Sequence, residues 1–268
     1  MFRKPVFRIA LCFLFLVASM AILAPYLTRF DPLFQLSEGL DDLGMPLSPG
    51  PIHWLGTDEM GRDVFSRLLF GGRNSLLVGF SATAIAGFIG VTVGLLSGYF
   101  GGLVDAFFMR LTEIFMAFPV LLLAIALAAV LPPTPLTVIL VLGFVGWTSL
   151  ARIVRALAMG LRETDFVLAS QAMGGGDPWV ICRHLLPNVA PAVLSLLTLK
   201  LADVFLLEAA LSFLGLGIRP PAPSWGGMVM ESQALFRTAP WLMIAPGLAI
   251  VSVVLCCNLL GEQIDPKQ

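Results

Sequence analysis

The chain has 268 residues, of which 58% are hydrophobic and only 12% are charged. This composition is too apolar for a water-soluble globular protein and indicates a chain that lies in a lipid bilayer. The formal net charge of −1 provides no attraction to a polyanion, which excludes nucleic-acid binding as the main function.

Six apolar stretches are long enough to cross a membrane, for which a helix needs roughly 20 apolar residues. The first could instead be a signal peptide, but its apolar core is long and no clear A-x-A site follows, so we expect it to be retained. The sequence therefore predicts an all-α membrane protein with six transmembrane helices. The stretches are residues 9–27, 75–100, two within 114–151 that "LPPTP" separates at 131–135, about 189–211, and 239–261.

The chain has no internal repeat and no polar linker, so we expect one membrane unit. Its predicted parts are a tail with the first span (1–28), an external segment (29–74), a five-helix core (75–261) and a cytoplasmic tail (262–268).

The distribution of Lys and Arg predicts the orientation, because these residues near the ends of spans tend to stay in the cytoplasm. Six spans place both termini on one side, and more of the basic residues fall on that side, so both termini are predicted to be cytoplasmic. The basic residues on this side are Arg3, Lys4, Arg8, Arg110, Arg152, Arg155, Arg162, Arg183 and Lys267, against Arg29, Arg62, Arg67, Arg73, Arg219 and Arg237 outside.

Small residues recur along the second span. Gly90, Gly94 and Gly98 stand four residues apart, and Gly79, Thr83 and Gly87 continue the pattern upstream. Such a face lets helix backbones approach closely in lipid, so the pattern predicts a tightly packed helix.

The cytoplasmic loop "DFVLASQAMGGGDPWVICRHLLPN" (165–188) contains two short helical patterns separated by three glycines. Thr164 or Asp165 can cap the first helix, and the glycines can adopt the left-handed conformation that ends it. One face of this helix is expected to hold Phe166, Ala169, Ser170 and Met173.

The second helix of this loop is expected to start with Asp177 as its cap and Pro178 at its first position, and to stop at Pro187. Residues 164–187 then form a helix, a glycine turn and a helix. Two interpretations apply: an amphipathic loop on the lipid headgroups, or a rigid docking element that transmits the motion of a partner.

The external stretch 56–73 is the most charged part of the chain. Asp58 with Arg62, and Asp63 with Arg67, stand four residues apart. These pairs predict a short amphipathic helix at the outer surface, with an apolar face made of Val64, Phe65, Leu68 and Leu69. It either seats the chain on the membrane or helps to form the surface that faces an external partner.

Three charges fall within the fifth span: Lys200 and Asp203 near its middle, and Glu208 near its outer end. Charges within a membrane are costly and usually face protein or water. Lys200 and Asp203 are three residues apart and either pair with each other or line a path, while Glu208 is a candidate for holding an external gate or a partner subunit.

The sequence contains no convincing enzymatic or metal site. His53 and His184 lie on opposite sides of the membrane in the predicted topology, and the four cysteines have no C-x-x-C spacing. No serine stands in G-x-S-x-G. A membrane-embedded enzyme and a channel that needs no ATPase are kept as alternative functions.

The loop at 165–188 resembles the cytoplasmic loop of the membrane subunits of bacterial ABC importers, whose pattern is E-A-A, three residues, Gly and a downstream L-P. Leu168 and Ser170 replace the Glu and the second Ala of that pattern. The matching residues, which the resemblance implies to couple the chain to an ATPase, are Ala169, Gly174, Leu186 and Pro187.

Two further stretches resemble the dipeptide, oligopeptide and nickel permease family, specifically its second type of subunit. They are "HWLGTDEMGRDVFSRLLFGGRNSLLVG" (53–79) and "EAALSFLGLGIRPPAPSWGGM" (208–228), the second of which begins with Glu208. The external motif contributes Gly56, Thr57, Asp58, Gly61, Arg62 and Asp63.

The resemblance implies a bundle like that of type I ABC importer permeases in the bacterial inner membrane. The implied partners are a homologous second permease subunit, two ATPase subunits that hold ATP and Mg, and an extracytoplasmic solute-binding protein. A P-loop needs Gly-Lys-Ser/Thr, and no lysine of this chain follows a glycine, so no cofactor is expected in it. The chain is predicted to move a peptide, nickel or a related small solute without altering it.

Overall fold

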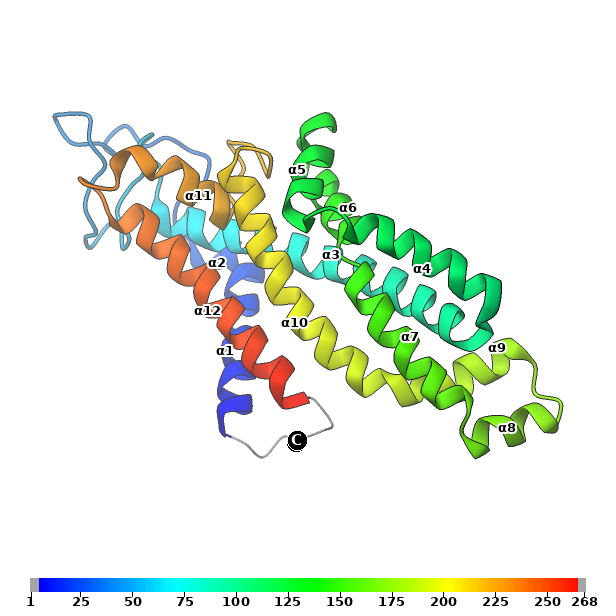
Figure 1. Ribbon diagram of the computed structural model, residues 1–268. Helices are drawn as coiled ribbons and strands as arrows, with labels where there is room; N and C mark the ends of the chain where they lie inside the picture. Colours follow the sequence, from blue (N-terminus) through cyan, green and yellow to red (C-terminus); the bar gives the residue numbers. More distant parts are fainter. Residues whose placement is uncertain (1–4, 265–268) are drawn as a thin grey trace.

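The computed structural model describes residues 5–264, which form an elongated bundle of helices (Figure 1). α1 (Pro5–Ile22) and α2 (Ala24–Leu27) precede an irregular segment, residues 28–63, and the long α3 (Val64–Phe100) follows. The remaining helices are α4 (Gly102–Met116), α5 (Val120–Val130), α6 (Pro135–Val145), α7 (Thr148–Arg162), α8 (Asp165–Ala172), α9 (Asp177–Val180), a π-helical turn (Ile181–Leu185), α10 (Leu186–Phe213), α11 (Trp225–Glu231), a 3₁₀ turn (Gln233–Leu235) and α12 (Trp241–Ile264).

The all-α membrane fold is confirmed. Four described helical runs are long and apolar enough to cross a bilayer: α1, α3, the run 177–213 and α12. Two bent pairs meet the same criteria, α4 with α5 at an angle of 83° and α6 with α7 at an angle of 40°. Counting each bent pair as one span yields the six predicted crossings.

The two bends were not predicted. The expected break at 131–135 is confirmed, because α5 ends at Val130 and α6 begins at Pro135. The stretch 114–151 also contains the sharp bend before Val120, where Pro119 disfavours helical geometry in the residue that precedes it. A second, gentler bend lies between α6 and α7, at Gly146 and Trp147.

α3 lies between α7 and α10, and its glycines set how close these helices come. A Cβ atom on Gly94 would lie 2.6 Å from the Val154 Cβ of α7, and a Cβ on Gly98 would lie 2.6 Å from the Ala158 Cβ. Earlier along the same stripe of small residues, a Cβ on Gly79 would lie 2.7 Å from the Phe205 ring of α10. The predicted close packing of this span is therefore confirmed.

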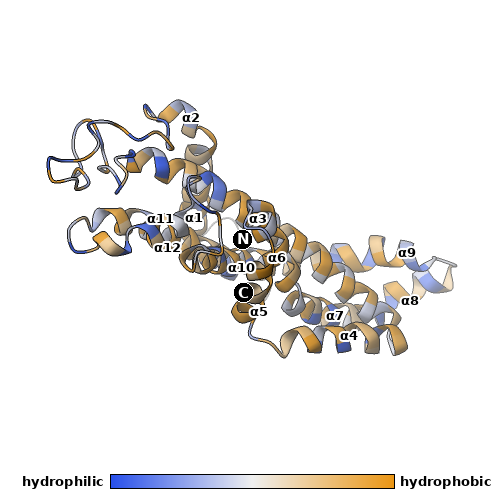
Figure 2. Cartoon of the chain, turned by 90° about the horizontal axis from the view of Figure 1, so that it is seen from above, coloured by the Kyte–Doolittle hydropathy of each residue, from blue (hydrophilic) through white to orange (hydrophobic). Residues whose placement is uncertain are grey.

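Apolar residues run along the helices, and hydrophilic residues concentrate in segment 28–63 and near α8 and α9 (Figure 2). The beginning of α1 and the end of α12 pack together through Phe7, Ala10 and Leu260. In Figure 1 both of these helix ends lie on the lower side with α8, whereas segment 28–63 and α11 lie on the upper side. Arg3, Lys4 and Lys267, three of the residues behind the predicted orientation, lie outside the described residues.

Candidate functional site

Residues 164–187 form two short helices joined by a glycine turn, as predicted; we call them the coupling element, after the role that the resemblance implies. Thr164 is the N-cap residue of α8, and Gly174 has a φ of +86°, which glycine adopts without strain. The amide N–H of Gly175 then donates to the Ser170 carbonyl oxygen at 2.9 Å and closes the end of α8. The turn is therefore a defined structure.

The second half of the coupling element differs from the prediction in two ways. Gly176 caps α9, while Asp177 is its first residue and accepts a hydrogen bond from another helix. Pro187 does not stop the helix, because the chain widens into a π turn where the Leu186 N–H reaches the Ile181 carbonyl oxygen. Pro187 lacks an N–H and lies just inside α10, a position where the missing donor costs little.

The apolar face of α8 points mainly away from the chain. Val167 and Ser170 are buried, but Phe166 is exposed and Met173 has 84% of its surface uncovered. Of the four residues predicted to share one face of this helix, Ser170 is buried, whereas Phe166, Ala169 and Met173 are exposed. The four residues matched to the ABC importer loop are also exposed: Ala169, Gly174, Leu186 and Pro187.

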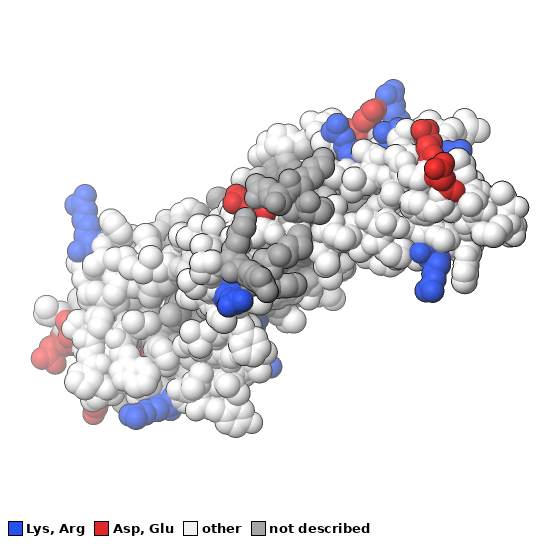
Figure 3. Space-filling view, turned by 90° about the horizontal axis from the view of Figure 1, so that it is seen from below, with Lys and Arg blue, Asp and Glu red and all other residues white. Residues whose placement is uncertain are grey.

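Charged side chains gather over the end of the molecule that carries α8 and α9 (Figure 3). This end therefore combines exposed apolar side chains with charges and a rigid turn. Such a surface is suited to contact another protein rather than the lipid interior.

Tyr99 connects the coupling element to α3, and the sequence reasoning missed it. Its hydroxyl donates to the Asp177 carboxylate at 2.8 Å and accepts from the Gln171 side-chain amide at 3.2 Å. One residue at the end of α3 therefore bonds to both α8 and α9. The sequence feature that could have revealed this contact is a tyrosine, whose hydroxyl can form hydrogen bonds, in the last turn of an apolar span.

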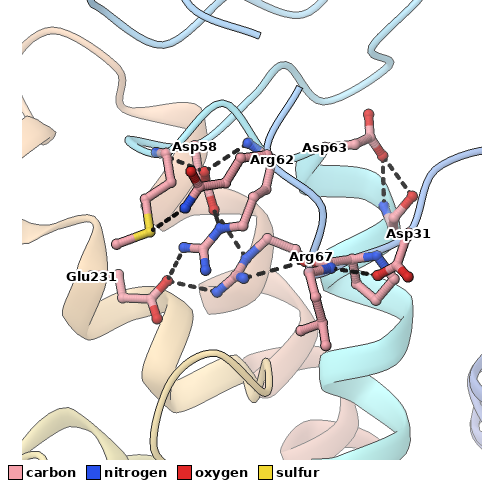
Figure 4. Close-up of polar contacts among 11 residues, drawn as sticks. Asp31, Asp58, Arg62, Asp63, Arg67 and Glu231 are labelled. Atoms are coloured by element: carbon pink, nitrogen blue, oxygen red, sulfur yellow. Dashed lines mark hydrogen bonds and ion pairs between the residues drawn. The ribbon is translucent and has the colours of Figure 1, made fainter. Parts of the chain in front are cut away.

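The end of the chain that is predicted to face outward contains a buried ion cluster (Figure 4), formed by Asp58, Arg62, Arg67 and Glu231. Asp58 Oδ2 lies 2.7 Å from Arg62 Nε and 3.1 Å from Arg67 Nε. Glu231 of α11 lies 2.6 Å from Arg67 Nη2 and 3.3 Å from Arg62 Nη2. We call these four residues the outer ion cluster; it joins the external segment, α3 and α11.

Burial raises the pKa of the Glu231 carboxyl, while Arg67 and Arg62 act in the opposite direction. Glu231 follows Arg67 by more than 160 positions, so local spacing provides no sign of this pairing. The contact depends on how α11 folds back over the beginning of α3.

The predicted amphipathic helix over 56–73 is wrong for residues 56–63, whereas residues 64–73 are helical and form the beginning of α3. Residues 56–63 form a loop in which Gly56 and Gly61 have φ values of +74° and +73°, and the helix starts only at Val64. Asp63 caps α3 by accepting from the Ser66 N–H at 2.8 Å, and its other oxygen lies 2.8 Å from His53 Nδ1. The predicted pair of Asp63 with Arg67 is therefore absent among these described contacts, whereas Asp58 and Arg62 do pair.

Thr57 completes the external motif. Its hydroxyl donates to the Gly39 carbonyl oxygen at 2.5 Å and accepts from the Leu47 N–H at 2.8 Å. All six motif residues are buried. The motif therefore stabilises the fold of the external segment and does not form its surface.

The intramembrane charges separate into two environments. Glu208 is buried within the chain and accepts from the hydroxyls of Ser212 and Ser75, at 2.8 and 3.2 Å, which ties α10 to α3. Lys200 Nζ lies 3.9 Å from Asp203 Oδ2, beyond hydrogen-bond distance, with side-chain exposures of 13% and 65%. The structure thus brings Lys200 and Asp203 near each other and keeps Glu208 apart.

No group of three or more metal-ligating side chains occurs among residues 5–264. His53 lies in the external segment with Asp63, while His184 lies in the π turn at the coupling element. The predicted separation of the two histidines is confirmed.

Comparison with known proteins identifies the family. Residues 90–268 match the family model described as "binding-protein-dependent transport system inner membrane component". A protein of Brucella suis biovar 1 (strain 1330) that carries the name of a peptide transport system permease is 38% identical over 270 residues, which cover 99% of this chain and 89% of that protein. The dipeptide transport system permease protein DppC of Alkalihalophilus pseudofirmus is 36% identical over 97% of this chain and 86% of its own length.

A solved structure shares the fold. The inward-facing methionine ABC transporter MetNI has a chain that matches with a TM-score of 0.60 and 20% identity, over 74% of this chain and 94% of that chain. At this identity the likeness concerns the arrangement of helices. The relatives, by contrast, extend along nearly the whole sequence, and the chain belongs to the binding-protein-dependent transport system inner membrane components, as a multi-pass permease subunit of an ABC importer.

Proposed function

We propose that this permease subunit imports short peptides that an extracytoplasmic solute-binding protein delivers. The curated relatives quoted above carry the names of peptide and dipeptide permeases, which supports peptides over nickel. The complete importer contains a second permease subunit and two ATPase subunits, which bind ATP and Mg. Both termini and the coupling element face the cytoplasm.

The structural observation that supports an ATP-driven importer is the exposed apolar surface of the coupling element, where an ATPase subunit can dock. Phe166, Leu168 and Met173 are large apolar side chains that the chain itself leaves uncovered. An ATPase subunit with an apolar groove covers them when it docks, because burial of apolar surface is the main force in such contacts.

The contacts of the coupling element supply a route for its motion. α9 continues through the π turn into α10, and Tyr99 bonds α8 and α9 to the end of α3. When ATP binding draws the two ATPase subunits together, the coupling element moves and α10 and α3 move with it. The path then opens alternately to the two sides of the membrane.

Uptake into proteoliposomes tests the substrate. We expect the complete importer, with the binding protein supplied outside, to accumulate the dipeptide alanyl-phenylalanine when ATP is enclosed. A complex whose ATPase subunits carry a P-loop Lys→Ala substitution should accumulate none. Uptake of Ni²⁺ without uptake of any dipeptide would contradict the proposal.

Copurification tests the docking surface. Met173→Glu should reduce recovery of the ATPase subunits with the permease, because it introduces a charge into an apolar contact. Leu43→Glu is a matched control, since Leu43 is 85% exposed but lies in the external segment. Equal recovery from the two variants would show that α8 is not the docking surface.

A further inference from the structure

The pair formed by Lys200 and Asp203 lies near the middle of α10, in a helical run that is apolar enough to cross the membrane. α3 and α12 cover two of the faces of α10. Phe205 and Glu208 face α3, and Ser195 donates to the Gly261 carbonyl oxygen of α12 at 2.6 Å. The apolar core with α5 and α6 covers a third face, through Val204 and Leu211.

Asp203 lies on the face of α10 that these helices leave open. Its side chain is 65% exposed, and Leu206 and Phe213 on the same face are 50% and 42% exposed. A carboxylate near the middle of a membrane-spanning helix is costly and is usually placed against protein or water rather than lipid. We therefore expect the open face of α10 to lie against protein or water in the assembled importer.

The Lys200 side chain packs against Gly146, at the bend between α6 and α7, and its ammonium group lies near Asp203. A Cβ atom on Gly146 would lie 3.0 Å from Lys200 Cε, so the glycine makes room for the lysine stem. The ammonium ends 3.9 Å from Asp203, and neither charged group forms a hydrogen bond with a residue of the described chain. Two opposite charges are thus held side by side with their hydrogen-bonding capacity unused.

We infer that Lys200 and Asp203 line the translocation path and bind the charged ends of a passing peptide, the lysine its carboxylate and the aspartate its ammonium group. This inference rests on the proposed function, which supplies the peptide. A short peptide carries both charges at neutral pH. An ion pair that is not closed by hydrogen bonds can exchange its partners without breaking strong contacts, so the peptide binds briefly and leaves.

Transport of end-blocked peptides tests the two roles separately. Uptake of alanyl-phenylalanine, its C-terminal amide and its N-acetyl form is measured with saturated binding protein. Because each variant meets the same binding protein, a change in the ratio between peptides reports the permease. Lys200→Met should reduce the preference for the free carboxylate by about tenfold and leave the preference for the free amine unchanged.

Asp203→Asn should produce the opposite pattern, with a weaker preference for the free amine alone. Lys200→Arg, which keeps the charge, and Leu206→Ala, which alters the same face without charge, should keep both preferences. ATP hydrolysis stimulated by the binding protein should stay at the native rate in Leu206→Ala, and it is measured in the other three variants so that uptake is compared per ATP hydrolysed. Unchanged preferences in Lys200→Met and Asp203→Asn complexes that still transport the dipeptide would overturn the inference.

Labelling with a charged methanethiosulfonate decides whether the pair lines a water-filled path, even where a substitution impairs transport. In a background without the native cysteines, Asp203→Cys in the assembled importer should react, whereas Val204→Cys, at a fully buried neighbour, should not. Protection of Asp203→Cys would place the pair against the second permease or lipid and overturn the inference. If the native importer carries no peptide but Asp203→Cys reacts, the proposed substrate is wrong and the position of the pair in the path is kept.

Discussion

Arg67 is among the most deeply buried large side chains of the chain, with 1% of its surface exposed. A guanidinium stays protonated in a protein, so its charge must be met by fixed partners. Asp58 and Glu231 provide these partners, and Arg62 shares both of them. The outer ion cluster is therefore a network in which removing one member leaves another charge buried.

Arg67→Met should lower the thermal stability of the purified importer strongly. Removing one partner of a buried ion pair typically costs about 3–5 kcal/mol, because the remaining charge is left uncompensated. The control is Arg110→Met, whose ion pair with Glu113 is exposed on both sides and should contribute nothing measurable. Both are followed by thermal unfolding in detergent, and equal melting temperatures would contradict the assigned network.

Local spacing predicts only some contacts of these residues. The sequence correctly pairs Asp58 with Arg62, although the two lie in a loop and not in a helix. It pairs Asp63 with Arg67 incorrectly, because Asp63 is the N-cap residue of α3 and its side-chain oxygens are taken by Ser66 and His53. A short polar side chain competes for backbone donors at a helix start, and a charge pattern alone does not show this.

At the scale of the element, the glycine turn of the coupling element contains positions with different requirements. Gly174 has a φ of +86° and open space around it, so its requirement is conformational only. Gly176 has a φ of −67°, and a Cβ there would meet only the Pro178 ring, at 4.0 Å. A substitution at Gly174 therefore strains the backbone, whereas an alanine at Gly176 meets neither strain nor crowding.

Gly174→Val should lower transport while the subunit still inserts and assembles, at reduced yield. A β-branched residue is strongly disfavoured at positive φ and will distort the turn. Gly176→Ala is the matched control and should transport normally, and Gly174→Asn should recover part of the activity because Asn tolerates this conformation. Uptake per assembled complex is the measurement, and native transport by Gly174→Val would show that the turn geometry is not required.

Membrane spans were predictable because their apolar length is a property of local sequence. Bends were less so. Pro119 produces the 83° bend before α5, yet Pro187, Pro191 and Pro246 lie within or just inside long helices. In a membrane bundle a local π turn or a neighbouring helix can compensate the lost hydrogen bond, so a proline alone does not determine where a helix ends.

At the scale of the whole molecule, the helix ends and the loops are sorted to two sides. α8, the beginning of α1 and the end of α12 lie on one side, and segment 28–63 with α11 on the other (Figure 1). This sorting agrees with an even number of crossings. Which side faces the cytoplasm is a prediction from the distribution of Lys and Arg.

Single cysteines test this orientation in a variant without Cys12, Cys182, Cys256 and Cys257. Asp42→Cys and Met173→Cys replace exposed side chains on the two sides. In spheroplasts, a membrane-impermeant maleimide should label Asp42→Cys at once and Met173→Cys only after permeabilisation. Labelling of both in intact spheroplasts would contradict the topology and the docking of an ATPase on α8.

The continuity of α3 has a mechanical consequence. Arg67 of the outer ion cluster and Tyr99 of the coupling contact stand on one unbroken helix, about 48 Å apart at 1.5 Å per residue. A rod of this length is a lever arm: a tilt of about 5° about one end displaces the other by about 4 Å. Because the helix is continuous, a tilt at one end displaces the contacts at the other end directly, without a relay of side-chain rearrangements.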